Sequence, residues 1–471
     1  MALEEQIRTP AFRLFLAIVV ALALTIPLFS VWLLVYDRQN QSEEATRSIT
    51  EGWGGPQAIA GPLLVIPYRA TATEAVVENG QSITRTNQVI KELTLAPEAA
   101  ELSTDVKPQV RNRSIYEAVV YDAEVRGTAR FGFPPDLARA GIAPEQMDLT
   151  RAELRFGLSD PRGLAANPRV AADGKLLRLQ PGGGSGGGRG FFAWIDATGL
   201  TGKAIAVDFA YDFRGNASLS LAPQAGDTRW TVKSSWPSPS FGGDFLPGAR
   251  QVSENGFTAA YQVGNLALGR SLVSTGDAGT SNIVERIPPP SREGAPTAAP
   301  ADLAGASGPV QSASISLLQP VDLYSQVNRA TKYGFLFIGF TFLALLMFDV
   351  IGEVRVSAVE YLLMGAAIVL FFVLLLAFAE VIGFTSAYVL ASAAIAGLNT
   401  AYSAAVLGSW RRAAFIGGLL IGLYAVLYIL LSLEAYSLLI GSLLLFAALA
   451  GLMYATRRID WGARRADPAA A

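Results

Sequence analysis

The last third of the chain, Tyr333 to Thr456, is a nearly unbroken series of apolar runs. Its few charges mark the gaps between the runs, and they are Asp349, Glu353, Arg355, Glu360, Glu380, Arg411, Arg412 and Glu434. Five stretches of roughly 18 to 25 mostly apolar residues result, each long enough as a helix to cross a hydrocarbon layer about 30 Å thick. A sixth, Phe12 to Tyr36, opens the chain. The sequence therefore predicts an integral membrane protein with six spanning helices.

The composition restricts the chemistry of the chain. Charged residues make up only 16% of the 471 residues and hydrophobic residues 51%, against roughly 25% charged residues in soluble domains. A net charge of −2, with no basic stripe, gives no reason to expect a nucleic-acid partner. The chain has no Cys and no His, which excludes disulfides, thiolate or imidazole zinc ligands and Ser-His-Asp catalysis. We expect no cofactor, no metal site and no enzymatic activity.

The first apolar run predicts an anchor that is kept. Arg8 and Arg13 precede it, and Leu14 to Tyr36 is about twice the usual apolar core of a secretory signal. The run ends in Val35-Tyr36-Asp37-Arg38, without a small-x-small cleavage site. We therefore expect residues 1–11 in the cytoplasm and residues 12–36 in the membrane.

The short gaps alternate in charge and predict the orientation. The gaps near 352–356 and 408–413, together with the tail, carry Arg355, Arg411, Arg412, Arg457, Arg458, Arg464 and Arg465. The gaps around Glu380 and Glu434 carry no Lys or Arg. Because cytoplasmic loops are enriched in positive charge, we expect both termini in the cytoplasm, the tail 457–471 included. A five-helix bundle then occupies 333–456, residues 37–331 are periplasmic, and Lys332 snorkels to the interface.

The long region between the first two spans has the pattern of β-structure. Apolar or small residues alternate with polar ones from Val119 to Phe131, as in a half-buried antiparallel strand. Shorter alternating runs are Ala152 to Leu158, Ala204 to Phe213, Ser218 to Ala222, Arg229 to Ser234 and Phe257 to Val263. Turn residues such as 160–163 and 214–216 separate them. The expected fold class is an α+β membrane protein with a large, β-rich, sandwich-like periplasmic region.

Two segments of this region have the composition of loops. The Gly-rich stretch 181–190 is predicted to be a flexible insert between strands, because no Gly-Lys-Ser/Thr follows it as in a phosphate-binding loop. The stretch 287–309 is rich in Pro, Ala, Gly and Ser and is predicted to be a linker.

Carboxylates at the ends of the spans are the ionisable candidates in the bundle. Glu360, Glu380 and Glu434 all fall near predicted boundaries, where a charged residue is most often only solvated. Glu380 is the strongest candidate, because its gap is too short to leave the interface and its side chain could face the external region or a partner. A transporter usually has ionisable groups or broken helices near the middle of the membrane, and the bundle has no charge there.

Several motifs resemble those of the CreD-like inner-membrane proteins of Gram-negative bacteria. They are Gly52-Trp53-Gly54 with Gln57 and the stretch 61–68, the stretch 234–247 (SSWPSPSFGGDFLP), 319–324 with 329–334, 360–363, and the gap 380–384. The resemblance covers about residues 50 to 456. One departure is Val381, where the family often has His. The Gly-rich and Pro-rich segments also look peculiar to this chain.

The resemblance implies a cell-envelope integrity protein, linked to a two-component response and to tolerance of agents such as colicins and β-lactams. The hypothesis is a non-enzymatic protein whose periplasmic β-region binds an envelope ligand or a periplasmic or membrane protein, besides membrane lipids. The alternative is an efflux or lipid-handling transporter that uses the bundle. The candidate interaction residues are Trp236, Pro237, Phe241, Asp244, Phe245, Glu380 and Glu360. The first five of these also fit a purely structural role, as a rigid loop that closes a β-core.

Overall fold

A computed structural model describes residues 10–50, 52–78, 81–113, 116–135, 137–184, 188–275, 283–284, 310–317, 323–351, 356–432 and 437–457. The chain forms two compact units. The helical unit comprises residues 1–43 and 321–471, and the β-rich unit comprises residues 44–320. The division falls inside helix α2 (Pro10–Thr50).

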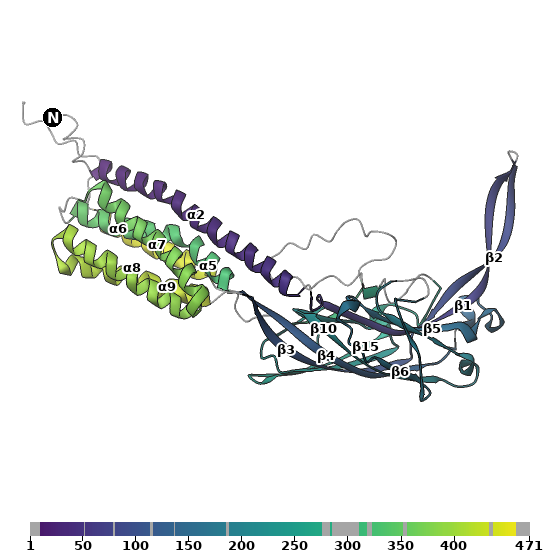
Figure 1. The fold of residues 1–471 in the computed structure, drawn as a ribbon. Coiled ribbons are helices and arrows are strands. Elements are labelled where there is room, and N and C mark those ends of the chain that lie inside the picture. Colours follow the sequence, from purple (N-terminus) through teal and green to yellow (C-terminus); the bar gives the residue numbers. More distant parts are fainter. Residues whose placement is uncertain are drawn as a thin grey trace, which may run out of the picture. The chain divides into compact units, whose positions relative to one another are not determined.

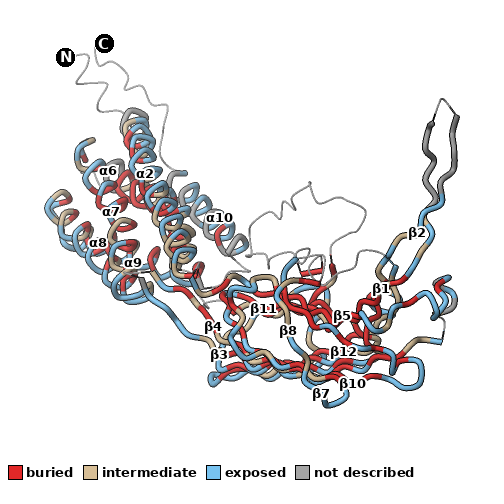
Figure 2. Tube along the Cα trace, turned by 45° about the vertical axis from the view of Figure 1, so that its right-hand side comes forward, coloured by how far each residue is buried: buried red, intermediate tan, exposed pale blue. Residues whose placement is uncertain are grey.

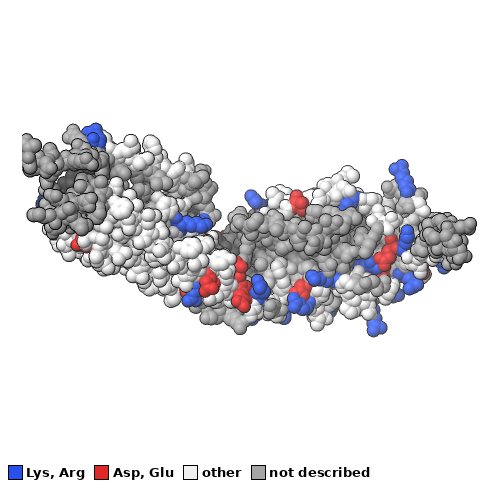
Figure 3. All heavy atoms as spheres, turned by 90° about the horizontal axis from the view of Figure 1, so that it is seen from above, with Lys and Arg blue, Asp and Glu red and all other residues white. Residues whose placement is uncertain are grey.

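The helical unit contains α2 and a C-terminal series of helices (Figure 1). That series is α5 (Leu323–Lys332), α6 (Gly334–Ile351), α7 (Ala358–Ile382), α8 (Phe384–Leu407), α9 (Trp410–Ser432) and α10 (Ser437–Thr456). One face of this unit is almost free of charge, whereas charged side chains are frequent over the β-rich unit (Figure 3). The apolar runs thus form helices, as their length predicts.

Five helices in the described residues are long and apolar enough to cross a membrane: Leu14–Thr50, Leu323–Met347, Ala358–Ile382, Phe384–Leu407 and Trp410–Leu431. This is one fewer than the predicted six. The predicted run that is not among these five forms the 20-residue helix α10, several of whose side chains lie outside the described residues. Two helices also extend beyond the predicted spans, because α2 continues past Tyr36 to Thr50 and α5 begins at Leu323. Lys332, predicted at the start of a span, is the last residue of α5.

Glycines make the tight turns between successive helices. Gly383, with φ 78°, is the single residue between α7 and α8, and Gly408, with φ 58°, ends α8 just before α9. Positive φ is accessible to glycine without steric cost, which makes it the usual residue at a helix C-terminus. Successive apolar runs can therefore fold back on one another with very short connections.

Aromatic side chains fill the interior of the bundle. Phe371 of α7 lies 4.6 Å, between ring centroids, from Tyr424 of α9, and Phe337 of α6 lies 5.0 Å from the same ring. Tyr388 of α8 adds a ring at 5.6 Å from Phe371 and donates a hydrogen bond to the Tyr424 carbonyl. All four side chains are buried. Rings at these separations contribute about 0.5–1.5 kcal/mol per pair beyond their buried area, so the four helices are joined through a packed centre.

The β-rich unit consists of two sheets, with nine and eight strands in the described residues. Sheet A has the order β13-β17-β11-β1-β5-β9-β8, and β2 pairs with β1 and β16. Its strands are β1 (Gln57–Glu78), β2 (Gln81–Leu95), β5 (Ala152–Leu158), β8 (Leu179–Pro181), β9 (Phe191–Ile195), β11 (Ser218–Ala222), β13 (Pro239–Gly243), β16 (Val273–Ser274) and β17 (Ala313–Leu317).

Sheet B has the order β14-β15-β12-β3-β4-β10-β6-β7. Its strands are β3 (Ala99–Arg113), β4 (Tyr116–Phe131), β6 (Arg169–Ala172), β7 (Lys175–Leu176), β10 (Ile205–Asn216), β12 (Asp227–Ser234), β14 (Ala249–Ser253) and β15 (Gly256–Gly264). Short helical segments join the strands at Leu137–Ala140, Pro144–Gln146, Leu149–Arg151, Pro161–Gly163, Thr198–Thr201 and Asn265–Leu268.

The two sheets share one hydrophobic core. Ile66 and Phe156 of sheet A belong to the same buried cluster as Tyr121, Phe213 and Trp230 of sheet B. Buried residues follow the strands of both sheets (Figure 2). Two sheets that bury their inner faces against each other form a β-sandwich, so the predicted sandwich-like architecture is confirmed.

The alternating runs are strands with nearly the predicted bounds, β4, β10, β12 and β15 among them. In β4 the odd positions from Tyr121 to Phe131 face the core. Two expectations were wrong in detail. Strand β5 is buried at every position, because it lies between β1 and β9 and its second face is also covered. The predicted turn 214–216 belongs to β10, and the chain instead turns at Ala217, with φ 53°, where it passes from sheet B to sheet A.

The two predicted loops have different outcomes. The Gly-rich stretch begins at the end of β8, which includes Pro181, and leads to β9; the Gly182 N–H donates a backbone hydrogen bond to the Gly190 carbonyl (3.0 Å). The Pro-rich stretch 287–309 lies outside the described residues, as do Glu434 and the motif residues 319–322.

Candidate functional site

The motif 234–247 closes one side of the β-sandwich. It begins at the end of β12 in sheet B, continues as β13 at the edge of sheet A, and leads into β14 of sheet B. Trp236, Phe241 and Phe245 are partly buried and pack against the shared core. The Phe241 ring meets Phe257 edge-on at 5.7 Å. Three of the predicted interaction residues thus point into the sandwich, which favours the structural interpretation for them.

Asp244 fixes this motif to Ser312, the residue that precedes strand β17. Its carboxylate accepts a hydrogen bond from the backbone N–H of Ser312 (2.9 Å), and its own N–H donates to the Ser312 carbonyl (2.7 Å). Gly243 precedes it with φ 83°, and a Cβ there would lie 2.3 Å from the same carbonyl oxygen. Pro237, Leu246 and Asp244 itself are exposed. The motif therefore has a small exposed surface, which the hydrogen bonds between Asp244 and Ser312 hold in place.

Glu360 is a helix cap. Its carboxylate accepts a hydrogen bond from the Ser357 N–H (2.6 Å), and Ser357 Oγ accepts one from the Glu360 N–H (3.4 Å). This reciprocal pair satisfies two backbone donors that would otherwise lack partners at the start of α7. These contacts indicate that Glu360 stabilises the N-terminus of α7.

Glu380 lies in a polar cluster that joins three helices of the helical unit. Its Oε1 accepts a hydrogen bond from the Tyr324 hydroxyl of α5 (3.3 Å) and lies 3.9 Å from Arg38 Nε of α2. Its side chain is only 13% exposed. A carboxylate near the C-terminal end of a helix is disfavoured by the helix dipole, and the Arg38 guanidinium offsets this. The cluster therefore ties α2 and α5 to the last turn of α7.

A cluster around Trp53, which we did not single out as a site from the sequence, orders the start of the β-rich unit. The guanidinium carbons of Arg111 and Arg214 lie 4.4 and 4.5 Å from the centre of the Trp53 ring. The indole N–H donates to the Tyr121 carbonyl (3.3 Å). Each cation–π contact contributes about 0.5–2 kcal/mol. The Gly-Trp-Gly motif thus joins β3, β4 and β10 to the segment that follows α2.

The buried amide of Gln57 completes this junction. Its Nε2 donates to the carbonyls of Arg214 (2.7 Å) and Asp160 (3.1 Å), and its Oε1 accepts from the Ser159 hydroxyl (3.1 Å) and the Asp160 N–H (3.2 Å). Tyr121 donates its hydroxyl proton to the Ser218 carbonyl (2.7 Å), and burial raises the pKa of this hydroxyl. Because buried polar groups are costly without partners, this network defines one geometry for the motif.

Asp160 gives this junction a pH dependence. Hydrogen bonds from the Arg162 side chain, opposed by burial and assisted by the N–H groups of Gly55 and Arg162, lower the pKa of Asp160 to about 2. A lowered carboxyl pKa stabilises the folded state above the unfolded value near 4, and this gain is lost as the pH falls through 2. We expect Asp160→Asn to cost about 1–2 kcal/mol at pH 7, allowing for the exposed Arg162. Urea unfolding of the wild type and of Asp160→Asn at pH 7 and at pH 2.5 measures this difference in stability, which should be smaller at pH 2.5. An equal difference at both pH values would contradict this assignment.

A buried ion network lies on the outer face of sheet A. Arg155 of β5 donates two hydrogen bonds to Glu92 of β2 (2.7 and 3.0 Å) and one from Nε to Glu153 (2.8 Å). The Arg155 and Glu153 side chains are 5% and 4% exposed. Burial acts to lower the pKa of Arg155, but the two carboxylates raise it, so the guanidinium stays charged. Gly184 of the Gly-rich segment lies directly over Arg155, where a Cβ would clash with it at 2.1 Å.

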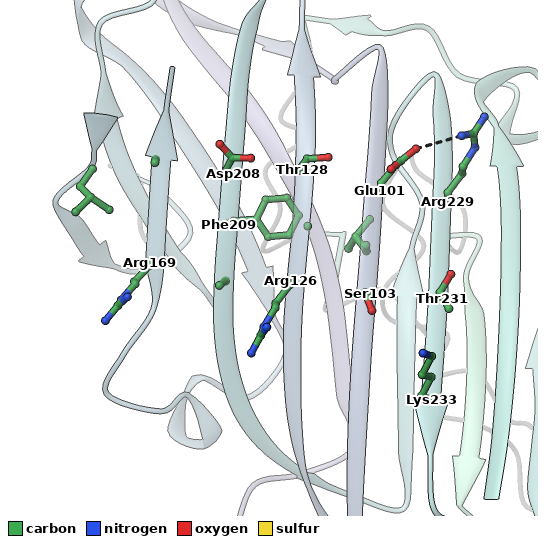
Figure 4. A pocket seen from close by; sticks show the side chains of 15 residues that line it. Glu101, Ser103, Arg126, Thr128, Arg169, Asp208, Phe209, Arg229, Thr231 and Lys233 are labelled. Carbon is green, nitrogen blue, oxygen red and sulfur yellow. Dashed lines mark hydrogen bonds and ion pairs between the residues drawn. The ribbon is translucent and has the colours of Figure 1, made fainter. Parts of the chain in front are cut away.

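The outward face of sheet B is hollowed into a groove of about 750 Å³. Strands β3, β4, β6, β10 and β12 contribute charged side chains to it (Figure 4). They are Glu101, Arg126, Arg169, Asp208, Arg229 and Lys233. The strand register aligns Arg169, Ala210, Arg126, Ser103 and Thr231 across five strands. The small residues of this row leave room between the cations.

The cations of this groove differ in how they are paired. Arg229 pairs with Glu101 (3.1 Å) and Asp227 (3.2 Å), and Arg126 lies 3.7 Å from Glu124. In the described part of the chain, Arg169 and Lys233 have no acidic partner within 4 Å. Neither cation is therefore neutralised by a direct ion pair with a described residue, although Asp105 lies opposite Lys233 in the strand register. No metal-binding group of three or more acidic residues occurs among the described residues.

Sequence comparison decides the family. A profile of the family described as "Inner membrane protein CreD" matches residues 9–462. The chain belongs to the CreD family of inner membrane proteins. It is 30% identical over 444 residues to the inner membrane protein CreD of Escherichia coli (strain K12), a match that covers 93% of this chain and 91% of that relative.

The CreD assignment confirms the resemblance inferred from the motifs. It also places the chain in the inner membrane, in agreement with the apolar helices. The roles of the seven candidate interaction residues remain predictions. The structure distributes them over three places: the loop that closes the sandwich, the cap of α7, and the polar cluster around Glu380.

Proposed function

We propose that this CreD family member is a non-enzymatic inner membrane protein that supports cell envelope integrity. In this proposal the β-rich unit is periplasmic, both termini are cytoplasmic, and the groove of sheet B binds an anionic envelope ligand or partner. One observation supports it most: Arg126, Arg169 and Lys233 project from rigid strands into an open groove, and two of them lack acidic partners among the described residues. A site on strands is held more precisely than one on loops.

The helical unit serves as an anchor in this proposal. Its centre is filled by the rings of Phe337, Phe371, Tyr388 and Tyr424. A transport pathway usually has polar or broken helices near the middle of the membrane. The packed aromatic centre supports anchoring rather than transport, and the absence of His and Cys supports a role without catalysis.

We expect the triple variant Arg126→Ala, Arg169→Ala, Lys233→Ala to lose the envelope function while it still folds. Its charges are on the surface, where substitutions usually change stability by less than about 0.5 kcal/mol. The test is complementation of a deletion strain of the host, measured as survival against a colicin and as the minimum inhibitory concentration of a β-lactam. Immunoblots confirm equal amounts of protein in the membrane.

The matched control is Arg139→Ala, Arg151→Ala, Lys203→Ala, which removes three cations outside the groove. This control should complement like the wild type. Full complementation by the groove variant would show that the groove does not carry the function. Failure of both variants would assign the effect to net charge rather than to the groove.

A further inference from the structure

An apolar groove runs between α2 and the α5–α6 segment of the helical unit. Its volume is about 580 Å³, and its walls are mostly apolar: Ile26, Phe29 and Trp32 on one side and Phe335 on the other. Phe29 and Phe335 are 58% and 56% exposed. In a membrane-spanning unit, surfaces of this kind are in contact with acyl chains.

One cation, Lys332, stands in this apolar groove. Among the described residues, no acidic side chain or hydrogen-bond acceptor pairs with its ammonium group. The contrast is Arg38, which lies beside Glu380. A charge near hydrocarbon is costly unless it reaches the interface or finds a counter-charge. The groove therefore combines a cation with apolar walls, and a bound ligand would have to supply the counter-charge.

Lys332 lies further along the candidate span Leu323–Met347 than the residue of α5 that contacts Glu380. It follows Tyr324, which contacts Glu380 in the last turn of α7, by eight positions of a helix, or about 12 Å at 1.5 Å per residue. A lysine can extend its ammonium from such a depth toward the interface. Trp32, on the same groove, has the amphipathic ring that is typical of the boundary between headgroups and hydrocarbon.

We propose that this groove binds an acidic glycerophospholipid, whose phosphate pairs with Lys332 and whose acyl chain lies against Phe29 and Phe335. A lipid with net negative charge neutralises the ammonium. A zwitterionic lipid brings its own ammonium group, which competes for the phosphate. The site therefore selects by headgroup charge, and the apolar walls restrict it to ligands with a hydrocarbon chain.

The test is lipid binding to the purified full-length protein in detergent, measured by native mass spectrometry. The probes are phosphatidylglycerol and phosphatidylethanolamine with identical acyl chains. We expect the wild type to bind phosphatidylglycerol about fivefold more tightly, because one Lys contributes about that factor toward an anionic lipid. Lys332→Gln should abolish this preference and leave phosphatidylethanolamine binding unchanged, whereas Lys332→Arg should retain it.

Two further variants separate the groove from general effects. Phe335→Ala should weaken both lipids alike, because it removes part of the apolar wall. Arg411→Gln, which removes a cation at the start of α9, should leave the preference intact. The proposal is overturned if Lys332→Gln keeps the preference or if the wild type does not distinguish the two lipids. Inorganic phosphate that displaces phosphatidylglycerol as well as the free lipid does would also overturn the proposal, because the apolar walls would then play no part. A dimer that lipid does not displace and that Lys332→Gln abolishes would overturn it too, because the groove would then be an interface between two copies of the chain.

Discussion

Replacing Arg155 with methionine is expected to destabilise the β-rich unit by about 3–5 kcal/mol, because it leaves the buried Glu153 carboxylate without its cation. Methionine occupies a similar volume, so the loss reports the charge rather than a cavity. Glu92, which is more exposed, can regain water on one side and contributes less. The measurement is urea unfolding of the full-length protein, followed by tryptophan fluorescence and by the rate of proteolysis of the β-rich unit.

The control for this prediction is the double variant Glu153→Gln, Arg155→Met. Removing both charges of a buried pair is far less costly than removing one, so the double variant should recover at least half of the lost stability. Arg130→Met, which breaks the exposed pair with Glu98, should cost less than about 1 kcal/mol. An Arg155→Met variant as stable as the wild type would show that the network is hydrated and not a buried element of the fold.

Elements that depend on local pattern could be predicted from the sequence. The apolar runs gave the helices because a run of about 20 residues has few other stable arrangements in a membrane. Strict alternation gave β4, β10, β12 and β15, since each has one face on the core and one on solvent. Strand β5 is buried on both faces, so alternation does not describe it; its burial is set by neighbours that are distant in sequence.

The sites could be predicted only in part, because their geometry comes from pairings across the chain. Glu380 was a candidate from its position at a helix end, but nothing local connects it to Arg38 and Tyr324. Trp53 stood out within a motif, yet its partners Arg111 and Arg214 come from different strands. The groove of sheet B depends on strand order, which brings cations that are far apart in the sequence onto one face of the sheet. Alternation reveals the outward face of each strand but not its neighbour.

Truncation of Trp230 to alanine is the second large expected effect, about 3–5 kcal/mol. The Trp230 side chain is fully buried on β12, stacks on Tyr261 at 5.1 Å and donates its indole N–H to Thr104 Oγ1 (2.9 Å). Trp230→Ala leaves a cavity between the sheets and a hydroxyl without its partner. The measurement is the urea midpoint of the full-length protein. Thr104→Val, which only orphans the indole N–H, should cost about 1–3 kcal/mol.

The comparison with Trp236→Ala makes this experiment informative about the motif 234–247. Trp236 is only partly buried at the edge of the same core, so its truncation should cost clearly less than that of Trp230. If Trp236→Ala retains most of the stability yet fails to support envelope tolerance, the motif acts in recognition. If instead it destabilises the unit as much as Trp230→Ala, the motif is a core element, and recognition must lie elsewhere, with the groove of sheet B the first place to look.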